Sequence, residues 1–166
     1  MPSNDKVFSG LVYLPKGQAS DNIIEGCIVL EGGAFRGVYG EGVLDALMEA
    51  GINMQTTIGT SAGALNGMNY VSGQIGRSAR INLEYRHDSR YVGTQALLSN
   101  KGVVGFDFAL NHDLPDDPFD IERFMDPKRR FIAVVTNLET GKAEYMEKGK
   151  CSDIMKAIQA SASMPV

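Results

Sequence analysis

Short continuous apolar runs alternate along this chain with segments in which apolar residues recur at helical spacing. Residues 27–30 form the first run, and the glycines around it are typical of a strand that is covered on both faces. We therefore expect this run to be the first central strand of a sheet. From residue 38 the period becomes helical, and Gly51 is placed to end that helix. Its expected apolar face is Val43, Leu44, Leu47 and Met48, and its polar positions are Glu41, Asp45 and Glu49.

The same alternation continues through the rest of the chain. The β-branched segment 55–59 predicts a second strand, and the small residues at 61–68 predict a helix that can lie close to a sheet. Further on, we expect an exposed helix after Gly76 and an irregular segment at 91–119. The last elements expected are a short helix at 120–125 capped by Asp120, a strand at 131–138 with a hairpin partner at 143–146, and a helix at 154–162 capped by Ser152.

Strands that alternate with helices favour an α/β fold, here a three-layer sandwich with a largely parallel central sheet. Residues 1–22 are polar around a short apolar segment at 7–14, which predicts an N-terminal arm or an edge strand. Residues 23–166 are then expected to form one domain. A length of 166 residues with 43% apolar residues is enough for a single hydrophobic core.

Charge and composition exclude several classes of function. The net charge of −4 and the scattered Lys and Arg residues lack the basic stripe of nucleic-acid-binding proteins. No segment reaches the roughly 18 apolar residues of a membrane span, and residues 1–22 do not have the pattern of a secretory leader, so we expect a cytoplasmic protein. Cys27 and Cys151 have no neighbouring Cys or His cluster, so we expect reduced thiols and neither a metal nor an organic cofactor.

The segment 59–63 matches G-x-S-x-G, in which a serine lies on a strained turn between a strand and a helix. Gly59 and Gly63 would leave room for the turn and for a substrate to reach Ser61. The helix that starts at the serine would direct its free N–H groups toward developing negative charge. We therefore expect Ser61 to be a catalytic nucleophile. The alternative is a glycine-rich turn that only joins a strand to a packed helix.

A second glycine-rich turn follows the first strand, at residues 31–37. Consecutive backbone N–H groups in such a turn can form an oxyanion hole, which holds the developing negative charge of acyl chemistry. The competing interpretation is a dinucleotide phosphate site, but a G-x-G-x-x-G match would need glycine at position 34, where the chain has Ala34. The residues expected to contribute to the oxyanion hole or substrate binding are Gly32, Gly33, Ala34, Arg36, Gly37 and Ala62.

These two turns, in this order, resemble a known family. Residues 29–37 are similar to the G-G-G-x-R-G oxyanion segment of patatin-like phospholipases, and residues 58–64 are similar to the nucleophile elbow of that family. The helix segment 43–47 also matches. Further stretches that resemble a bacterial branch of the family lie at 116–120, 134–137 and 160–165. The likeness extends from Ile24 to Val166.

The resemblance implies a serine lipid acyl hydrolase of the phospholipase A or esterase type, acting on a lipid or acyl ester that it meets at a membrane surface. It also implies a Ser–Asp dyad, in which Ser61 attacks the ester and an aspartate from a later D-G-[GA] motif takes its proton. That motif does not occur in this sequence. The resemblance therefore places the aspartate beyond Val166, and we expect the chain alone to be inactive. Arg36 would be an ion-pair partner that shapes the oxyanion turn, and Ala34 departs from the family pattern at its third glycine.

Two other functions fit parts of the pattern. A non-catalytic lipid- or acyl-binding module would keep the fold without a complete dyad, since a serine without a base is a poor nucleophile. An acyl-carrier transacylase also uses G-x-S-x-G, but commonly with histidine before the serine, where this chain has Thr60. The histidines and several aspartates are expected to be surface or turn residues and not bases, namely His87, His112, Asp107, Asp113, Asp117 and Asp126.

Overall fold

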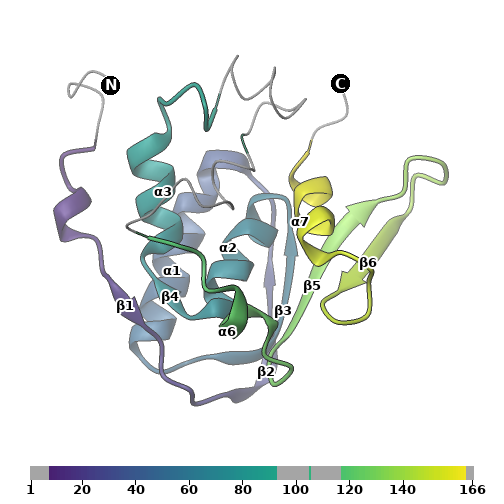
Figure 1. Cartoon of the computed structure of the whole chain (residues 1–166), viewed down its shortest axis with the longest axis horizontal. Helices are drawn as coiled ribbons and strands as arrows, with labels where there is room; N and C mark the ends of the chain where they lie inside the picture. The colour runs from purple at the N-terminus through teal and green to yellow at the C-terminus, as the bar shows by residue number, and fades with distance from the viewer. Residues whose placement is uncertain (1–7, 93–104, 106–116, 164–166) are drawn as a thin grey trace.

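A four-stranded sheet forms the centre of the computed structural model, which describes residues 8–92, 105 and 117–163 (Figure 1). The spatial order of the strands is β2-β3-β5-β6. β2, β3 and β5 are parallel, and β6 pairs antiparallel with β5. Their bounds are Ile24–Leu30 for β2, Met54–Thr60 for β3, Arg130–Thr136 for β5 and Ala143–Glu147 for β6. The expected α/β class, with its largely parallel sheet and its C-terminal hairpin, is confirmed.

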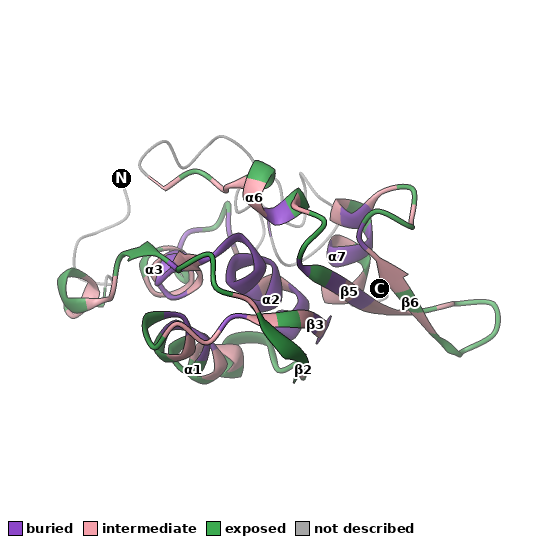
Figure 2. Cartoon of the chain, turned by 90° about the horizontal axis from the view of Figure 1, so that it is seen from below, coloured by how far each residue is buried: buried purple, intermediate pink, exposed green. Residues whose placement is uncertain are grey.

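Helix α2 (Ala62–Ser72) lies closest to the sheet and is buried along almost all of its length (Figure 2). Small residues make this close contact possible. A Cβ atom on Gly67 would lie only 3.0 Å from the methyl group of Thr57 and 3.1 Å from the ring of Phe131. The other helices are α1 (Gly37–Glu49), α3 (Arg77–Tyr85), α6 (Ile121–Met125) and α7 (Ile154–Ala162).

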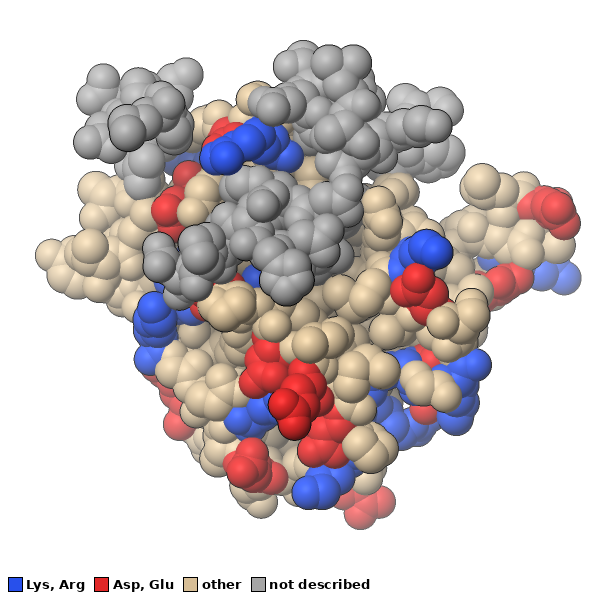
Figure 3. Space-filling model, in the orientation of Figure 1, with Lys and Arg blue, Asp and Glu red and all other residues tan. Residues whose placement is uncertain are grey.

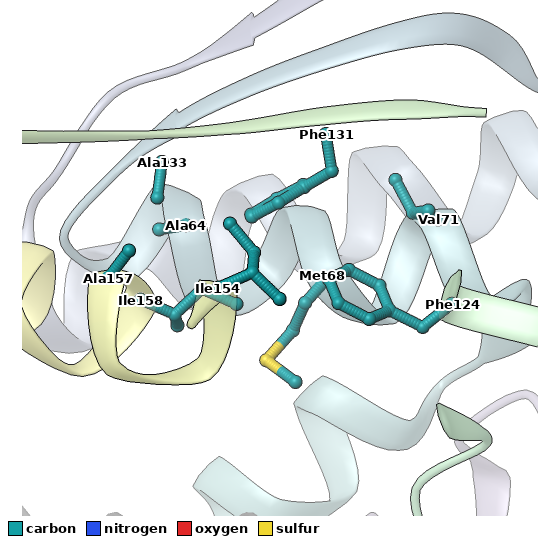
Figure 4. Close-up of a cluster of buried hydrophobic side chains, with 9 residues drawn as sticks. All are labelled: Ala64, Met68, Val71, Phe124, Phe131, Ala133, Ile154, Ala157 and Ile158. Carbon is teal, nitrogen blue, oxygen red and sulfur yellow. The ribbon is translucent and has the colours of Figure 1, made fainter. Parts of the chain in front are cut away.

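The main hydrophobic core lies between the sheet, α2, α6 and α7 (Figure 4). The rings of Phe124 and Phe131 meet at 65° with centroids 5.4 Å apart, which is a favourable edge-to-face arrangement. Met68 and Ile158 are fully buried in the same cluster. Because this core joins α7 to α2 and β5, it fixes the C-terminal helix beside the end of β3.

The other face of the sheet is not covered by any helix among the described residues. Val29 is 72% exposed and Tyr145 is 67% exposed, whereas Ile28 and Leu30 point to the opposite side and pack against α1. The interpretation of residues 27–30 as a central strand covered on both faces is therefore wrong for the described part of the chain, where β2 is an edge strand. A continuous apolar run does not reveal where its strand lies in the sheet.

Two local expectations near the ends of the chain are corrected. The apolar segment at 7–14 does not form an edge strand, because Leu11–Tyr13 is a short 3₁₀ helix and residues 1–7 lie outside the described part. The N-terminal strand is instead β1 (Gly17–Gln18), which pairs antiparallel with β4 (Gln74–Ile75). Helix α7 is capped by Asp153 and not by Ser152, since the Asp153 carboxylate accepts a hydrogen bond of 3.0 Å from the Lys156 N–H. The Asp120 cap of α6 is confirmed.

Helices α1 and α3 bury side chains that their patterns place on polar faces. Glu41 and Asp45 of α1 are both buried, and the Asp45 carboxylate accepts a hydrogen bond of 2.7 Å from the N–H of Gly76. α3 was expected to be exposed, but it buries Arg77 and Ile81. Since α3 packs beside α1, the polar side of α1 becomes an internal surface.

The structure also bears on the expected absence of membrane spans and disulfides. None of the described helices is long and apolar enough to cross a membrane. Cys27 and Cys151 are free thiols, the first exposed and the second half-buried. On the face shown in Figure 3, basic and acidic side chains are interspersed.

Candidate active site

Ser61 occupies the sharp turn between β3 and α2. Its backbone has φ 54° and ψ −123°, a conformation that a non-glycine residue adopts only when its surroundings hold it there. The carbonyl of Ser61 accepts the first hydrogen bonds of α2, from Ala64 at 2.9 Å and Leu65 at 3.2 Å. Its hydroxyl does not cap the helix. The serine side chain is therefore available to a ligand.

The glycines on either side of Ser61 are required by close backbone contacts. A Cβ on Gly59 would lie 2.4 Å from the carbonyl oxygen of Gly63, and a Cβ on Gly63 would lie 2.4 Å from that of Leu30. Both distances are far inside van der Waals contact. The turn can thus form only if the start of α2 lies directly against the ends of β2 and β3.

The second glycine-rich turn lies beside the first. A Cβ on Gly32 would be 2.9 Å from the Cβ of Ser61 and 3.6 Å from its Oγ. Further along, a Cβ on Gly37 would be 3.1 Å from the Cβ of Ala62. Because β2 and β3 are parallel neighbours, their carboxyl ends bring the two turns together at one edge of the sheet.

Within this second turn, residues Ala34–Arg36 form a short 3₁₀ helix that leads into α1. Ala34 has φ 47°, a conformation that favours glycine, so its backbone is strained at the position where the sequence departs from the G-G-G pattern. The N–H of Arg36 donates to the carbonyl of Gly33 at 3.0 Å. The Arg36 side chain is exposed and forms no ion pair within the described ranges, so the expected salt bridge is not formed there.

Ser161, at the end of α7, contacts the backbone of the Ser61 turn. The N–H of Ser61 donates a hydrogen bond of 2.8 Å to the Ser161 hydroxyl, which in turn donates to the carbonyl of Val134 at 2.6 Å. Sequence reasoning did not assign this role. The only available signal was the similarity of residues 160–165 to the family, which gives no function for the serine.

A pocket with a volume of about 150 Å³ opens beside Ser61, between α1, α2 and α3. Its wall combines apolar side chains with buried polar ones. The residues that line it are Ala34, Phe35, Glu41, Ser61, Ala62, Leu65, Asn66, Met68, Asn69, Arg77, Ser78, Ile81, Asn82, Tyr91, Val92 and Ala162.

Glu41 is the buried carboxyl group of this pocket wall, and it is only 2% exposed. Burial raises its pKa to about 7, against the opposing effect of hydrogen bonds from Asn82 and Ser78. Tyr91 donates to the Asn82 side chain at 2.6 Å and continues the network. The sequence gave no signal for this cluster, because the helical pattern places Glu41 on a polar face.

The remaining candidate acids and bases do not gather at Ser61. His87 is exposed, and Asp117 forms an ion pair with Arg80 at 2.7 Å. Asp126 accepts a hydrogen bond of 2.9 Å from the N–H of Lys128, as a turn residue does. His112, Asp107 and Asp113 lie outside the described residues. Over the described ranges, no group of three His, Cys, Asp or Glu side chains is arranged to hold a metal ion.

Comparison with known proteins gives two findings. Residues 28–166 match the family model described as "Patatin-like phospholipase". The "Uncharacterized protein YjjU" of Escherichia coli (strain K12) is 24% identical over 142 residues, which are 83% of this chain and 40% of that relative. The chain therefore spans about 40% of the length of the curated relative that it matches.

Proposed function

The chain belongs to the patatin-like phospholipase family, and on this premise we propose that it carries the nucleophile of a serine lipid acyl hydrolase. The nucleophile is Ser61, and the bond attacked is the carboxylic ester of a lipid or another acyl ester. One observation carries the proposal: Ser61 is held in a strained turn at the wall of a pocket, directly beside the glycine turn at 32–37.

In the proposed reaction, Ser61 Oγ attacks the ester carbonyl carbon while an aspartate takes the hydroxyl proton. The resulting tetrahedral intermediate expels the alcohol, which receives the proton, and leaves the acyl group on Ser61. Water, deprotonated by the same aspartate, then releases the carboxylic acid. We assign the base to an aspartate C-terminal to Val166, as the family resemblance implies.

The oxyanion of the intermediate needs hydrogen-bond donors that are already in place. We assign this role to the backbone N–H groups of residues 32–34, together with that of Ala62 at the start of α2. The contact between Gly32 and Ser61 supports this assignment, as does the position of Ser61 at the N-terminus of an 11-residue helix. Loss of one such donor typically costs about 3 kcal/mol of transition-state stabilisation.

We also assign the exposed apolar side chains around the pocket to contact with a lipid surface. Phe35 lines the pocket and is partly exposed, and Tyr39 and Val43 follow it at intervals of four residues. Tyr39 is 84% exposed. Residues four positions apart lie on one side of a helix, so the three form an apolar stripe that leads to the pocket.

The sharpest test uses the full-length protein with Ser61→Ala. Hydrolysis of a p-nitrophenyl acyl ester and labelling by a fluorophosphonate probe should both be lost, because the covalent route is removed. Ser163→Ala is the matched control, since Ser163 is an exposed serine whose hydroxyl bonds only to the Gln159 carbonyl in the described structure. If the Ser61→Ala variant retained the parent rate, Ser61 would not be the nucleophile.

The pocket itself favours a second candidate function, that of a non-catalytic lipid- or acyl-binding module. The same experiment separates the two. A full-length protein that binds acyl esters but gives no fluorophosphonate adduct at Ser61 would be a binding module and not a hydrolase.

A further inference from the structure

Glu41 has a carboxyl oxygen that no group in the described part of the chain satisfies. Its Oε1 accepts a hydrogen bond from the Asn82 amide and lies 3.3 Å from the Ser78 hydroxyl. Its Oε2 is fully buried and has no hydrogen-bond partner. The residue lies in the wall of the Ser61 pocket. A buried polar atom without a partner costs about 1 to 3 kcal/mol, so it calls for an explanation.

The Ser78 hydroxyl does not offset this deficit. A hydroxyl has a single proton to donate, and Asn66 Oδ1 is the nearer acceptor at 3.0 Å. The Asn66 amide is oriented by its own donation of 3.0 Å to the carbonyl of Gly37, which leaves Oδ1 facing Ser78. We therefore assign the Ser78 proton to Asn66.

The single firm donor to Glu41 is then the amide of Asn82. Its orientation is fixed, because Tyr91 donates to Asn82 Oδ1 at 2.6 Å and so turns Nδ2 toward Glu41. One donor is too few for a buried carboxylate, which has about four acceptor sites. The neutral acid is accordingly favoured, and because Oε1 accepts from Asn82, the acid proton lies on Oε2.

Other charged groups around Glu41 act in the same direction or are already engaged. Asp45, one turn further along α1, repels the carboxylate form of Glu41. Arg77 of α3 lines the same pocket but donates to Asn69 at 2.9 Å and to the carbonyl of Asp117 at 3.0 Å. Tyr91 stays neutral, since burial raises the pKa of its hydroxyl. Glu41 Oε2 is thus an unpaired donor at low pH and an unpaired acceptor at high pH.

We propose that Glu41 determines specificity in the Ser61 pocket by forming a hydrogen bond, through Oε2, with a hydroxyl group on the part of the substrate that enters the pocket. A hydroxyl is the one neutral group that satisfies both states of the carboxyl, because it accepts from the acid and donates to the carboxylate. The inference rests on the proposed function, and it names the substrate class as esters of short hydroxylated acyl chains.

The size of the pocket limits the chain that it accepts. A cavity of about 150 Å³ holds a molecule of roughly six carbon atoms, as the benzene-binding cavity of the same size shows. The hydroxyl is therefore expected within about six atoms of the ester carbonyl. A long saturated chain would not fit within this volume and would leave Oε2 unpaired.

Binding can be measured apart from catalysis in the full-length Ser61→Ala variant. The probes are hexan-1-ol and the 1,4-, 1,5- and 1,6-hexanediols, with dissociation constants from NMR chemical-shift titration. We expect at least one diol to bind roughly fivefold more tightly than hexan-1-ol, the usual size of one net hydrogen bond. Equal affinity for hexan-1-ol and all three diols would overturn the proposal, whatever the outcome of the hydrolysis test at Ser61.

Substitutions then assign the preference to Glu41. Glu41→Met, which is apolar and of similar length, should abolish the preference for the diol. Asp45→Asn is the matched control, because Asp45 is another buried carboxyl of α1 that does not line the pocket, and it should leave the preference intact. A diol preference that survives Glu41→Met would assign the hydroxyl to another group.

A second measurement stays informative even if Glu41→Met does not fold. The probe 6-methoxyhexan-1-ol can only accept at its ether oxygen, so it should bind well at pH 6 and several-fold more weakly at pH 8, where Glu41 is a carboxylate. Glu41→Gln keeps a donor at every pH and should remove this dependence. A pH dependence that persists in Glu41→Gln would contradict the proposal.

Discussion

The backbone N–H of Ser61 donates a hydrogen bond of 2.8 Å to the hydroxyl of Ser161, although 100 positions of sequence separate the two residues. The same hydroxyl donates to the carbonyl of Val134 in β5. One side chain thus joins the end of α7, the sheet and the strained turn. A backbone in an unfavourable conformation persists only when tertiary contacts hold it, and this is one such contact.

Replacement of Ser161 by alanine should therefore loosen the turn. The N–H of Ser61 and the carbonyl of Val134 would both lose their partner, which should lower the free energy of unfolding by about 1 to 3 kcal/mol. In the full-length protein, kcat for ester hydrolysis should fall about tenfold or more because the nucleophile is less well positioned. Urea denaturation and steady-state kinetics measure the two effects. Ser163→Ala serves as control, and equal behaviour of the two variants would contradict a positioning role for Ser161.

The packing of α2 against the strand ends gives a second prediction. In Gly63→Ala, the new methyl group would lie 2.4 Å from the carbonyl oxygen of Leu30, so we expect a loss of stability of more than about 2 kcal/mol. Gly42→Ala is the matched control, because its methyl group meets nothing within 4 Å inside a helix and should stabilise α1 by about 0.5 to 1 kcal/mol. Thermal unfolding of the two variants should shift in opposite directions.

A third prediction concerns the contact between the two turns. In Gly32→Ala, the new methyl group would lie 2.9 Å from the Cβ of Ser61, so one turn must shift away from the other. We expect ester hydrolysis by the full-length protein to fall at least about a hundredfold, as for the loss of an oxyanion donor. Gly40→Ala, whose nearest contact is 3.9 Å away, should retain activity. Unchanged activity in Gly32→Ala would separate this turn from the chemistry.

Ala34 supplies a fourth prediction, in the opposite direction. Its φ of 47° costs an alanine more than a glycine, so Ala34→Gly relieves strain in the folded state while it adds freedom to the unfolded chain. The two effects are similar in size, and the net change in unfolding free energy should stay within about 1 kcal/mol. Chemical denaturation checks this value. A loss well above it would show that the methyl group of Ala34 packs in the pocket wall.

The raised pKa of Glu41 predicts how stability depends on pH. The folded state binds the proton of Glu41 up to about pH 7, whereas the unfolded state releases it near pH 4.5. The stability that this difference provides is fully present below pH 4.5 and is lost as pH rises to about 7, by up to about 3 kcal/mol. Glu41→Gln should remove that slope. Unfolding free energies of the parent and variant between pH 4 and 8 test it, and parallel curves would contradict the burial of an acid at this site.

Much of the candidate site follows from local sequence. The G-x-S-x-G segment places Ser61 between a strand and a helix because glycine and β-branched residues restrict the backbone over a few positions. The glycine turn at 32–37 follows its strand for the same reason. Their proximity follows from topology, since neighbouring parallel strands end at the same edge.

Other features were decided only by the tertiary structure. Whether β2 is central or at an edge depends on which strands lie beside it, and a run of apolar residues is equally compatible with both. The role of Ser161 depends on where the hydrophobic core places α7, and the burial of Glu41 depends on the packing of α3 against the polar side of α1. The sequence by itself thus determined the local backbone of both turns, because short-range sterics control it. The partners of Ser61 and Glu41 come from distant segments, and only long-range packing brings those segments together.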